Sequence, residues 1–239
     1  MMVPYFGAAL PLLGESCRKG AAGHENGTQK GRGALRRRGQ ALMDKRLLET
    51  GTVIFDVGKV LLTFEPERVA SLLPGEHRQA LKEAMFGPVH RWSEFDLGRK
   101  PNEQIAQEIA LAAGVPGGAK MVLEALYRFP ETMGPLPLYA CIAPLKEMGK
   151  KLYALTNYAE PSFTFTKEAF PALKELDGEA VSSREKVCKP DKSFYRLLLD
   201  RYGIDPAGAL YIDDAEANIR AGAQLGLRVW HYFGEDRGA

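Results

Sequence analysis

Short apolar runs alternate with longer stretches of helical periodicity from Thr52 to the end of the chain. Runs of four or five apolar residues rich in Val, Ile and Tyr predict buried parallel strands, and the stretches between them predict covering helices. The predicted strands are Thr52–Phe55, Leu152–Leu155, Glu179–Ser182, Ala209–Ile212 and Leu227–His231. The pattern therefore predicts an α/β fold with a Rossmann-like parallel sheet flanked by helices.

The clearest of the covering helices is expected after Lys189. Phe194, Leu197, Leu198 and Tyr202 follow helical spacing, and Gly203 stands where a helix C-cap is expected.

A long helical insertion separates the first predicted strand from the second. Apolar residues recur there at spacings of three and four, interrupted by Gly or Pro, in Leu72–Leu73, Ala80–Met85, Ile105–Leu111 and Met121–Leu126. We expect residues 65–131 to form a small α-helical cap and residues 49–64 and 132–239 to form the core. Such a cap, beside the carboxyl edge of the sheet, would act as a lid.

The N-terminal region has a different composition. Residues 1–42 hold seven Lys or Arg against two Asp or Glu, although the whole chain of 239 residues has a net charge of only +2. Because no apolar period is sustained there, we expect residues 1–48 to be a disordered basic tail. A linker, a targeting segment and an extension upstream of Met43 remain open interpretations.

The remainder of the chain is mildly acidic and has no basic stripe interleaved with aromatic residues, which argues against a nucleic-acid partner. The three cysteines have no short paired spacing, so neither a disulfide framework nor a zinc site is predicted. The apolar run Val3–Leu13 is short and contains two prolines, which argues against a membrane span. We expect a cytoplasmic protein with no membrane partner; its oligomeric state is not predicted.

Candidate chemistry lies where the predicted strands end. Asp56, Thr156-Asn157, Lys189 and Asp213-Asp214 end or closely follow four of the predicted strands. In parallel α/β sheets ligands bind outside the carboxyl ends of the strands, so these residues should converge. A carboxylate nucleophile, a hydroxyl and an amide for a phosphoryl oxygen, a lysine and an acidic pair together suit phosphate chemistry.

These residues also carry a family resemblance. The run from Val53 to Leu62, then Leu155-Thr-Asn157, Lys189-Pro190 and Tyr211-Ile-Asp-Asp214, resembles the four ordered motifs of the haloacid dehalogenase superfamily. The likeness extends from Gly51 to the C-terminus, and the helical insertion resembles the small helical cap of that family. The chain looks most like the subgroup of bacterial hexose-1-phosphate phosphatases.

The resemblance implies a mechanism for each motif. Asp56 would be the nucleophile that forms an aspartyl phosphate, which water then hydrolyses. Thr156 and Asn157 would bind the phosphoryl group, and Lys189 would bind it and offset its charge during catalysis. The substrate would be a small phosphorylated metabolite, with a sugar phosphate as one candidate.

The resemblance also implies a Mg²⁺ cofactor. Its ligands would be Asp56, the backbone carbonyl of Gly58, and Asp213 or Asp214, directly or through water. The sequence does not decide which of Asp213 and Asp214 ligates directly.

One position departs from the family pattern. A second Asp, the usual general acid, is expected two residues after the nucleophile, and Gly58 stands there instead. Either the substrate has a good leaving group, or Lys59, Glu65 or a cap residue supplies the proton. Polar and aromatic residues of the insertion that could contact a leaving group are His90-Arg91-Trp92 and Glu94-Phe95-Asp96.

Two other functions stay open at this point. A catalytically silent relative that binds a phosphorylated ligand or a partner is consistent with Gly58. A metal-independent dehalogenase would use the same Asp56, although the acidic pair at Asp213-Asp214 argues against it.

Overall fold

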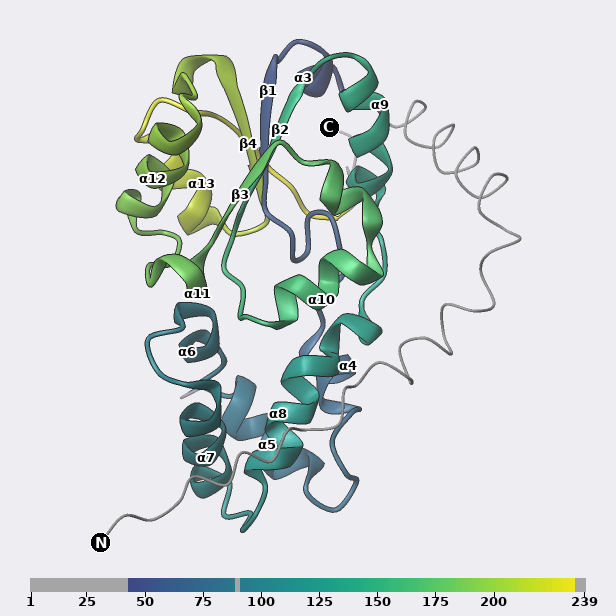
Figure 1. Cartoon of the computed structure of the whole chain (residues 1–239), viewed down its shortest axis with the longest axis vertical. Helices are drawn as coiled ribbons and strands as arrows, with labels where there is room; N and C mark the ends of the chain where they lie inside the picture. The colour runs from purple at the N-terminus through teal and green to yellow at the C-terminus, as the bar shows by residue number, and fades with distance from the viewer. Residues whose placement is uncertain (1–42, 89–90, 235–239) are drawn as a thin grey trace, which may run out of the picture.

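The computed structural model describes residues 43–88 and 91–234. Its centre is a sheet of five parallel strands in the order β3-β2-β1-β4-β5 (Figure 1). The strands are β1 (Thr52–Phe55), β2 (Lys151–Thr156), β3 (Gly178–Val181), β4 (Ala209–Asp213) and β5 (Arg228–His231). This confirms the predicted α/β fold with a Rossmann-like sheet. The basic tail predicted for residues 1–48 lies outside the described residues, except for its last six.

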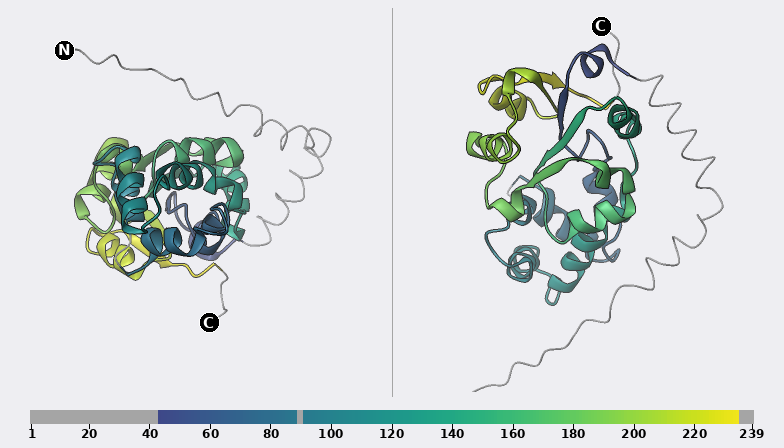
Figure 2. Two further views of the ribbon diagram at one scale, coloured as in Figure 1. Left: turned by 90° about the horizontal axis from the view of Figure 1, so that it is seen from below. Right: turned by 45° about the horizontal axis from the view of Figure 1, so that its top comes forward.

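Helices cover both faces of the sheet. α12 (Lys192–Tyr202) and α13 (Glu216–Ala223) lie on one face, and α9 (Ile142–Glu147) and α10 (Ser162–Ala169) lie on the other (Figures 1 and 2). Strand residues alternate between the faces: Ile54 packs in a core with the α12 side, whereas Val53 and Phe55 pack in the core of the opposite face. Because both faces are covered, the strands are apolar on both sides.

The helix predicted after Lys189 is α12. Asp191 accepts a hydrogen bond from the backbone N–H of Ser193 at its N-terminus, and Gly203 ends it in the left-handed conformation at φ 61°. The third strand differs from the prediction at its end. Ser182 begins α11 (Ser182–Glu185) instead of completing β3.

The segment between β1 and β2 is helical and lies below the carboxyl edge of the sheet in Figure 1. Its helices are α4 (Pro66–Ala70), α5 (Arg78–Phe86), α6 (Trp92–Leu97), α7 (Asn102–Ala112) and α8 (Ala119–Arg128). We refer to these five helices as the cap helices; the exact division into core and cap stays a prediction. The remaining elements are α3 (Lys45–Leu48) and the 3-10 helices η1 (Phe129–Thr132), η2 (Pro137–Cys141), η3 (Pro171–Glu175) and η4 (Pro206–Gly208).

The chain enters and leaves the cap helices at adjacent points. Thr63 donates its backbone N–H to the carbonyl of Gly134 at 2.8 Å, and the Gly134 N–H donates to Thr63 Oγ1 at 2.8 Å. Leu136 donates to the Leu61 carbonyl at 2.9 Å. These bonds join the two connections into a short ribbon.

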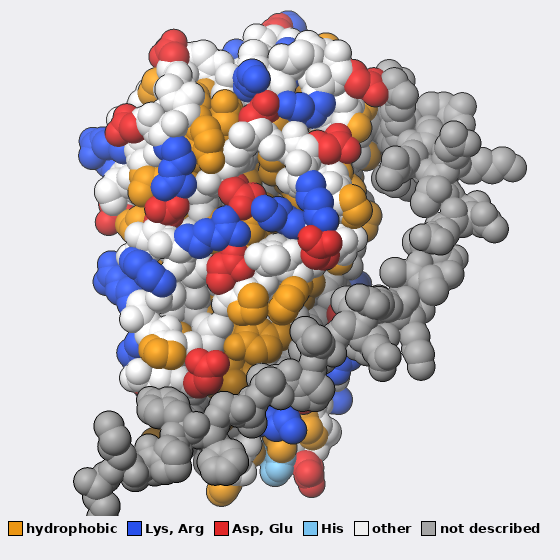
Figure 3. Space-filling model, in the orientation of Figure 1, with side chains coloured by type: hydrophobic (Ala, Val, Ile, Leu, Met, Phe, Trp, Pro, Cys, Tyr) orange, Lys and Arg blue, Asp and Glu red, His pale blue; other side chains and the backbone are white. Residues whose placement is uncertain are grey.

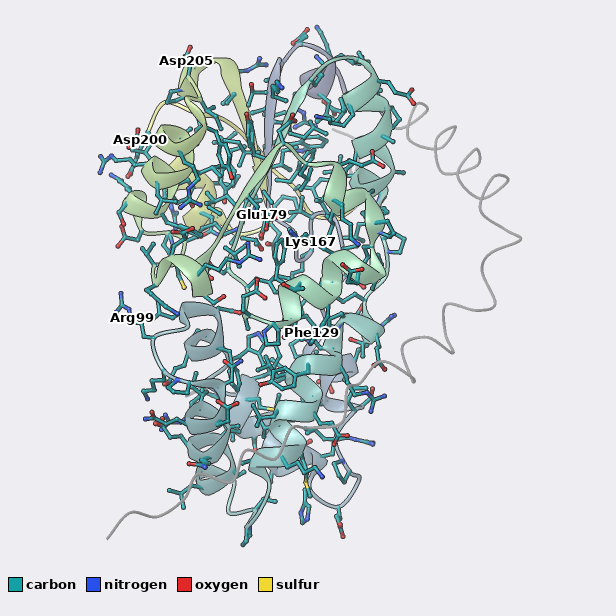
Figure 4. The ribbon with its side chains drawn as sticks, viewed as in Figure 1. Arg99, Phe129, Lys167, Glu179, Asp200 and Asp205 are labelled. Atoms are coloured by element: carbon teal, nitrogen blue, oxygen red, sulfur yellow. The ribbon has the colours of Figure 1, made fainter. Side chains whose placement is uncertain are left out.

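Apolar packing ties the cap helices to the sheet. Phe95, Ile105 and Leu126 belong to the same buried cluster as Val53 and Phe55. The ring centroid of Phe129, which is labelled in Figure 4, lies 5.4 Å from the ring centroids of both Trp92 and Tyr158. The cap helices therefore share one hydrophobic core with the α9 side of the sheet.

Charges on the viewed face are mixed in sign (Figure 3). Lys167 lies 2.9 Å from Glu179 (Figure 4), and Arg184 pairs with Glu160 and Glu179. No helix within the described part of the chain has the length and apolar character needed to cross a membrane. Cytoplasmic location stays a prediction.

Candidate active site

The nucleophile candidate lies at the centre of the carboxyl edge of the sheet. Asp56 follows β1, and its backbone N–H donates to the Ile212 carbonyl at 2.9 Å, which extends the ladder by one residue. Thr156 is the last residue of β2, and Asp213 is the last residue of β4. Because β2 and β4 flank β1, these three residues lie together at one edge.

Lys189 reaches this edge from the loop before α12. Its Nζ atom lies 2.8 Å from Asp56 Oδ1 and 2.7 Å from Asp213 Oδ2, and its side chain is 1% exposed. The ammonium group therefore bridges two carboxylates from adjacent strands.

The Asn157 side chain holds the Lys189 backbone in place. Its Nδ2 donates to the Lys189 carbonyl at 3.1 Å, and its Oδ1 accepts from the Lys189 N–H at 2.8 Å. This pair of bonds connects β2 to the loop that carries the lysine. It also engages both polar atoms of the amide that the resemblance assigns to phosphate binding.

The two adjacent aspartates have different surroundings. Both oxygens of the fully buried Asp213 are engaged, because Oδ1 accepts from the Ala215 N–H at 2.8 Å and from Asn218 Nδ2 at 2.9 Å. Its Oδ2 accepts from Lys189 and from the Tyr211 hydroxyl. These bonds fix Asp213 firmly.

Asp214 is less constrained. Its side chain is 26% exposed, and the nearest cation is Lys59, at 3.8 Å. Asp214 is therefore the more available of the two carboxylates for an incoming ligand.

Burial and mutual charge shift the acidity of these groups. Burial raises the pKa of Asp56 to about 7, although Lys189 opposes the rise. Burial alone would lower the pKa of Lys189, but the carboxylates of Asp213 and Asp56 raise it above its usual value. Burial would raise the pKa of Asp213, but the charge of Lys189 outweighs burial, so the pKa of Asp213 is lowered. Burial and then Asp213 raise the pKa of Asp214.

The donor set fits a divalent cation. One oxygen atom from each of Asp56, Asp213 and Asp214 lies within 4.8 Å of the others, the one such acidic cluster found within the described residues. Three clustered carboxylates, only two of which pair with the buried ammonium group of Lys189, leave excess negative charge, and hard oxygen donors suit Mg²⁺. The Gly58 carbonyl is supplied by the tight turn that follows Asp56, where Lys59 has φ 60°.

Thr156 offers an unpaired hydroxyl at the same edge. The residue is 1% exposed, and its Oγ1 atom has no hydrogen-bond partner. A buried hydroxyl without a partner is costly, so such a group beside a nucleophile suggests a ligand that completes it. A phosphoryl oxygen on Asp56 would suit it.

Sequence reasoning missed one contribution. The Tyr211 hydroxyl bonds to Asp213; the two-residue period of a strand, which places residues 211 and 213 on one face, was the available signal. Among the cap candidates named from the sequence, Asp96 stands out, because burial and then the charge of Asp56 raise its pKa to about 7. Of the other cap candidates, Trp92 is buried among aromatic rings and Arg91 pairs with Glu94 and Glu108, while His90 lies outside the described residues.

Comparison with known proteins gives a family match and a similar protein sequence. Residues 50–226 match the family model for haloacid dehalogenase-like hydrolases. Sesquiterpene phosphatase astK from Aspergillus oryzae is 26% identical over 185 residues, which cover 74% of this chain and 87% of that protein.

Solved structures share the fold. A HAD family enzyme from Bacteroides thetaiotaomicron, in complex with magnesium and inorganic phosphate, aligns with TM-score 0.64 at 20% identity, covering 79% of this chain and 97% of that one. L-2-haloacid dehalogenase from Xanthobacter autotrophicus aligns with TM-score 0.53 at 21% identity, covering 75% and 76%.

Proposed function

The chain belongs to the haloacid dehalogenase-like hydrolase family, and on that premise we propose that it is a Mg²⁺-dependent phosphatase for a small phosphorylated metabolite. One observation carries the proposal: the carboxylates of Asp56, Asp213 and Asp214 cluster at the carboxyl edge of the sheet, and Lys189 bridges two of them, Asp56 in the central position and Asp213. The likeness to a sesquiterpene phosphatase supports phosphate-ester chemistry over attack on carbon.

In this reaction Asp56 attacks the phosphorus atom and displaces the alcohol, which leaves an aspartyl phosphate. Water then attacks the same phosphorus, releases inorganic phosphate and restores the carboxylate. Lys189 offsets the negative charge of Asp56 and of the phosphoryl group, and the unpaired Thr156 hydroxyl donates to a phosphoryl oxygen. Asn157 serves mainly to position Lys189.

Asp56, Asp214 and the Gly58 carbonyl would hold Mg²⁺, with Asp213 acting directly or through water. The bound ion would neutralise phosphoryl charge and orient the phosphate. Asp213 is already saturated with hydrogen bonds, so its larger role is to fix Lys189.

Gly58 motivates the second candidate function, a silent relative that binds a phosphorylated ligand without turnover. A Cβ at position 58 would meet nothing closer than Phe64 Cβ at 3.8 Å, so the backbone there accepts a residue with a side chain without a clash at Cβ. Glycine at this position is therefore not imposed by packing.

Phosphate release from a panel of sugar and nucleotide monophosphates, with Mg²⁺ and with chelator, tests the proposal. We expect release that needs Mg²⁺ and that Asp56→Asn lowers by about 10³-fold or more. Asp200→Asn is the matched control, because Asp200 is exposed on α12 (Figure 4). Release that persists in chelator contradicts the metal role. Ligand binding without release from any compound supports the silent relative.

A further inference from the structure

The cap helices bring a carboxyl group, that of Asp96, near enough to the nucleophile Asp56 for the two charges to interact. Asp96 lies near the end of α6, which packs against α11 at the carboxyl end of β3. Ser182 Oγ donates to the Asp96 carbonyl at 2.5 Å, although the two residues are far apart in sequence. The backbone of Asp96 is therefore attached to the core beside the site.

Gly98 enforces this close approach. It has φ 61°, and a Cβ there would lie 2.5 Å from the Ser183 carbonyl oxygen. Phe95 anchors the other side of Asp96, because it is fully buried among the apolar cap residues. The backbone of Asp96 is thus fixed on one side by the buried Phe95 and on the other by the close contact of Gly98 with Ser183.

The carboxyl group of Asp96 faces the site without a bonding partner. Among the described residues it makes no hydrogen bond or ion pair. The charged and titratable groups that face it are Asp56 after β1, Lys189 and Cys188 before α12, and Tyr158 after β2. They come from three segments of the core, which follow β1, follow β2 and precede α12.

The other candidate proton donors each have a charged partner. Lys59 lies 3.8 Å from Asp214 and its side chain is 56% exposed, while Glu65 pairs with Arg68 at 3.1 Å on the surface. Glu94 pairs with Arg91 and Lys100. Asp96 is the cap carboxyl group that is left unpaired near Asp56.

We propose that Asp96 is the general acid and base of this enzyme, in place of the side chain that Gly58 lacks. This inference rests on the proposed phosphatase function.

In the first step Asp56 forms a bond to phosphorus while the P–O bond to the alcohol breaks. The electron pair stays on the leaving oxygen, which takes the proton from Asp96. In the second step the oxygen of the attacking water forms a bond to phosphorus, and the Asp96 carboxylate accepts a proton from that water. The bond between phosphorus and the Asp56 oxygen breaks, its electron pair stays on the Asp56 carboxylate, and inorganic phosphate leaves. Both side chains return to their starting states.

The acidity of Asp96 suits this exchange. Burial, with the negative charge of Asp56 adding to it, raises its pKa from 3.8 to about 7. A carboxyl group with a pKa near the operating pH can both give and take a proton.

Leaving-group dependence tests the assignment. In Asp96→Asn, kcat/KM for an alkyl phosphate should fall by roughly 10²-fold or more, because an alkoxide needs a proton as it leaves. For p-nitrophenyl phosphate the fall should be less than about 10-fold, because that leaving group needs little protonation. Ser93→Ala, an exposed change on the same helix, should leave both values unchanged.

Two further readouts separate catalysis from structure. The alkaline limb in the pH profile of the parent on the alkyl ester should disappear in Asp96→Asn. Gly58→Asp added to Asp96→Asn should restore much of the alkyl phosphatase activity, since a Cβ at position 58 meets no clash and the new carboxyl group would lie two residues after Asp56.

Equal losses on both esters, or a change in KM alone, would overturn the role of Asp96 while leaving the phosphatase proposal intact. A parent that releases phosphate from neither ester contradicts the phosphatase proposal itself, and the role of Asp96 with it. Circular dichroism of each variant checks that a loss is not caused by unfolding.

Discussion

The two sides of the site, one formed by the core and the other by the cap helices, differ in how their polar side chains are paired. On the core side, Lys189, Asp213 and Asn157 are bound to one another, and Asp213 has both oxygens occupied. On the cap side, the carboxyl group of Asp96 lies near Asp56 and makes no hydrogen bond or ion pair among the described residues. One of the bonds between the two sides runs from Ser182 Oγ to the Asp96 carbonyl.

This difference separates positioning from chemistry. Buried polar groups that satisfy one another form a rigid frame, because leaving any of them unpaired in a low dielectric is costly. A carboxyl group without a partner keeps its bonding capacity for a substrate. The core side therefore fixes geometry, and the cap side keeps a group free to react.

The largest effect is expected from removing the cation of the core side. Lys189→Met leaves the carboxylates of Asp56 and Asp213 buried without their shared ammonium group. We expect a loss of about 3–5 kcal/mol in the free energy of unfolding in chelator, together with loss of phosphate release. Urea denaturation measures the first quantity.

Lys192→Met is the matched control, because Lys192 is exposed at the start of α12. Added Mg²⁺ should recover part of the stability of Lys189→Met, since a cation at the three carboxylates offsets their charge. An unfolding free energy equal to that of the control would show that the frame does not depend on Lys189.

An intermediate effect is expected at the unpaired hydroxyl of the core side. Thr156→Val removes a buried hydroxyl that has no partner, so stability should stay within about 1 kcal/mol of the parent or rise. Phosphate release should nevertheless fall about 10²-fold, because one donor to the phosphoryl group is lost.

Ser183→Ala provides the comparison for Thr156→Val. Ser183 carries the other buried hydroxyl without a partner in the described part of the chain, and it lies beside Gly98 under α6. We expect the free energy of unfolding of Ser183→Ala to change as little as that of Thr156→Val, while phosphate release stays at the level of the parent. Full activity in Thr156→Val would remove Thr156 from the phosphate site.

The smallest effect in this series is the contribution of Asp96 to the pH dependence of the free energy of unfolding. Its folded pKa of about 7 lies above the ordinary 3.8, so the folded protein binds this proton more tightly than the unfolded chain does. Stability from this group is present at low pH and is lost as pH rises towards and through 7. The free energy of unfolding of Asp96→Asn should therefore be closer to that of the parent at pH 5. At pH 8 it should be larger than that of the parent by on the order of 1–2 kcal/mol.

Denaturation in chelator at the two pH values measures this difference, and Asp200→Asn should show no such pH dependence. A variant that is less stable than the parent at pH 8 would mean that the carboxylate of Asp96 is a structural partner. That result would remove the contrast between the two sides of the site.

The sequence predicted much of the frame, because each strand motif is local. β1 has the predicted bounds, and Asp56, Thr156, Lys189 and Asp213 converge as expected. Sequence could not separate Asp213 from Asp214, because the difference depends on Tyr211, Asn218 and Lys189 closing around one carboxylate.

The cap side was predicted less well for a similar reason. Periodicity identified helices but could not select Asp96 from its neighbours, since its position depends on contacts with Ser182 and Ser183 of the distant α11. The preference for bacterial hexose-1-phosphate phosphatases stays a prediction, as do the roles of the site residues.

The ribbon that joins Thr63 to Gly134 and Leu61 to Leu136 has a consequence for how such proteins diversify. Everything between these points is one uninterrupted stretch of chain, and its two ends are already within hydrogen-bonding distance. One gene segment could therefore be exchanged for another without reordering any strand or moving Asp56. The cap helices are thus one continuous insertion whose two ends meet beside the strand that leads to Asp56.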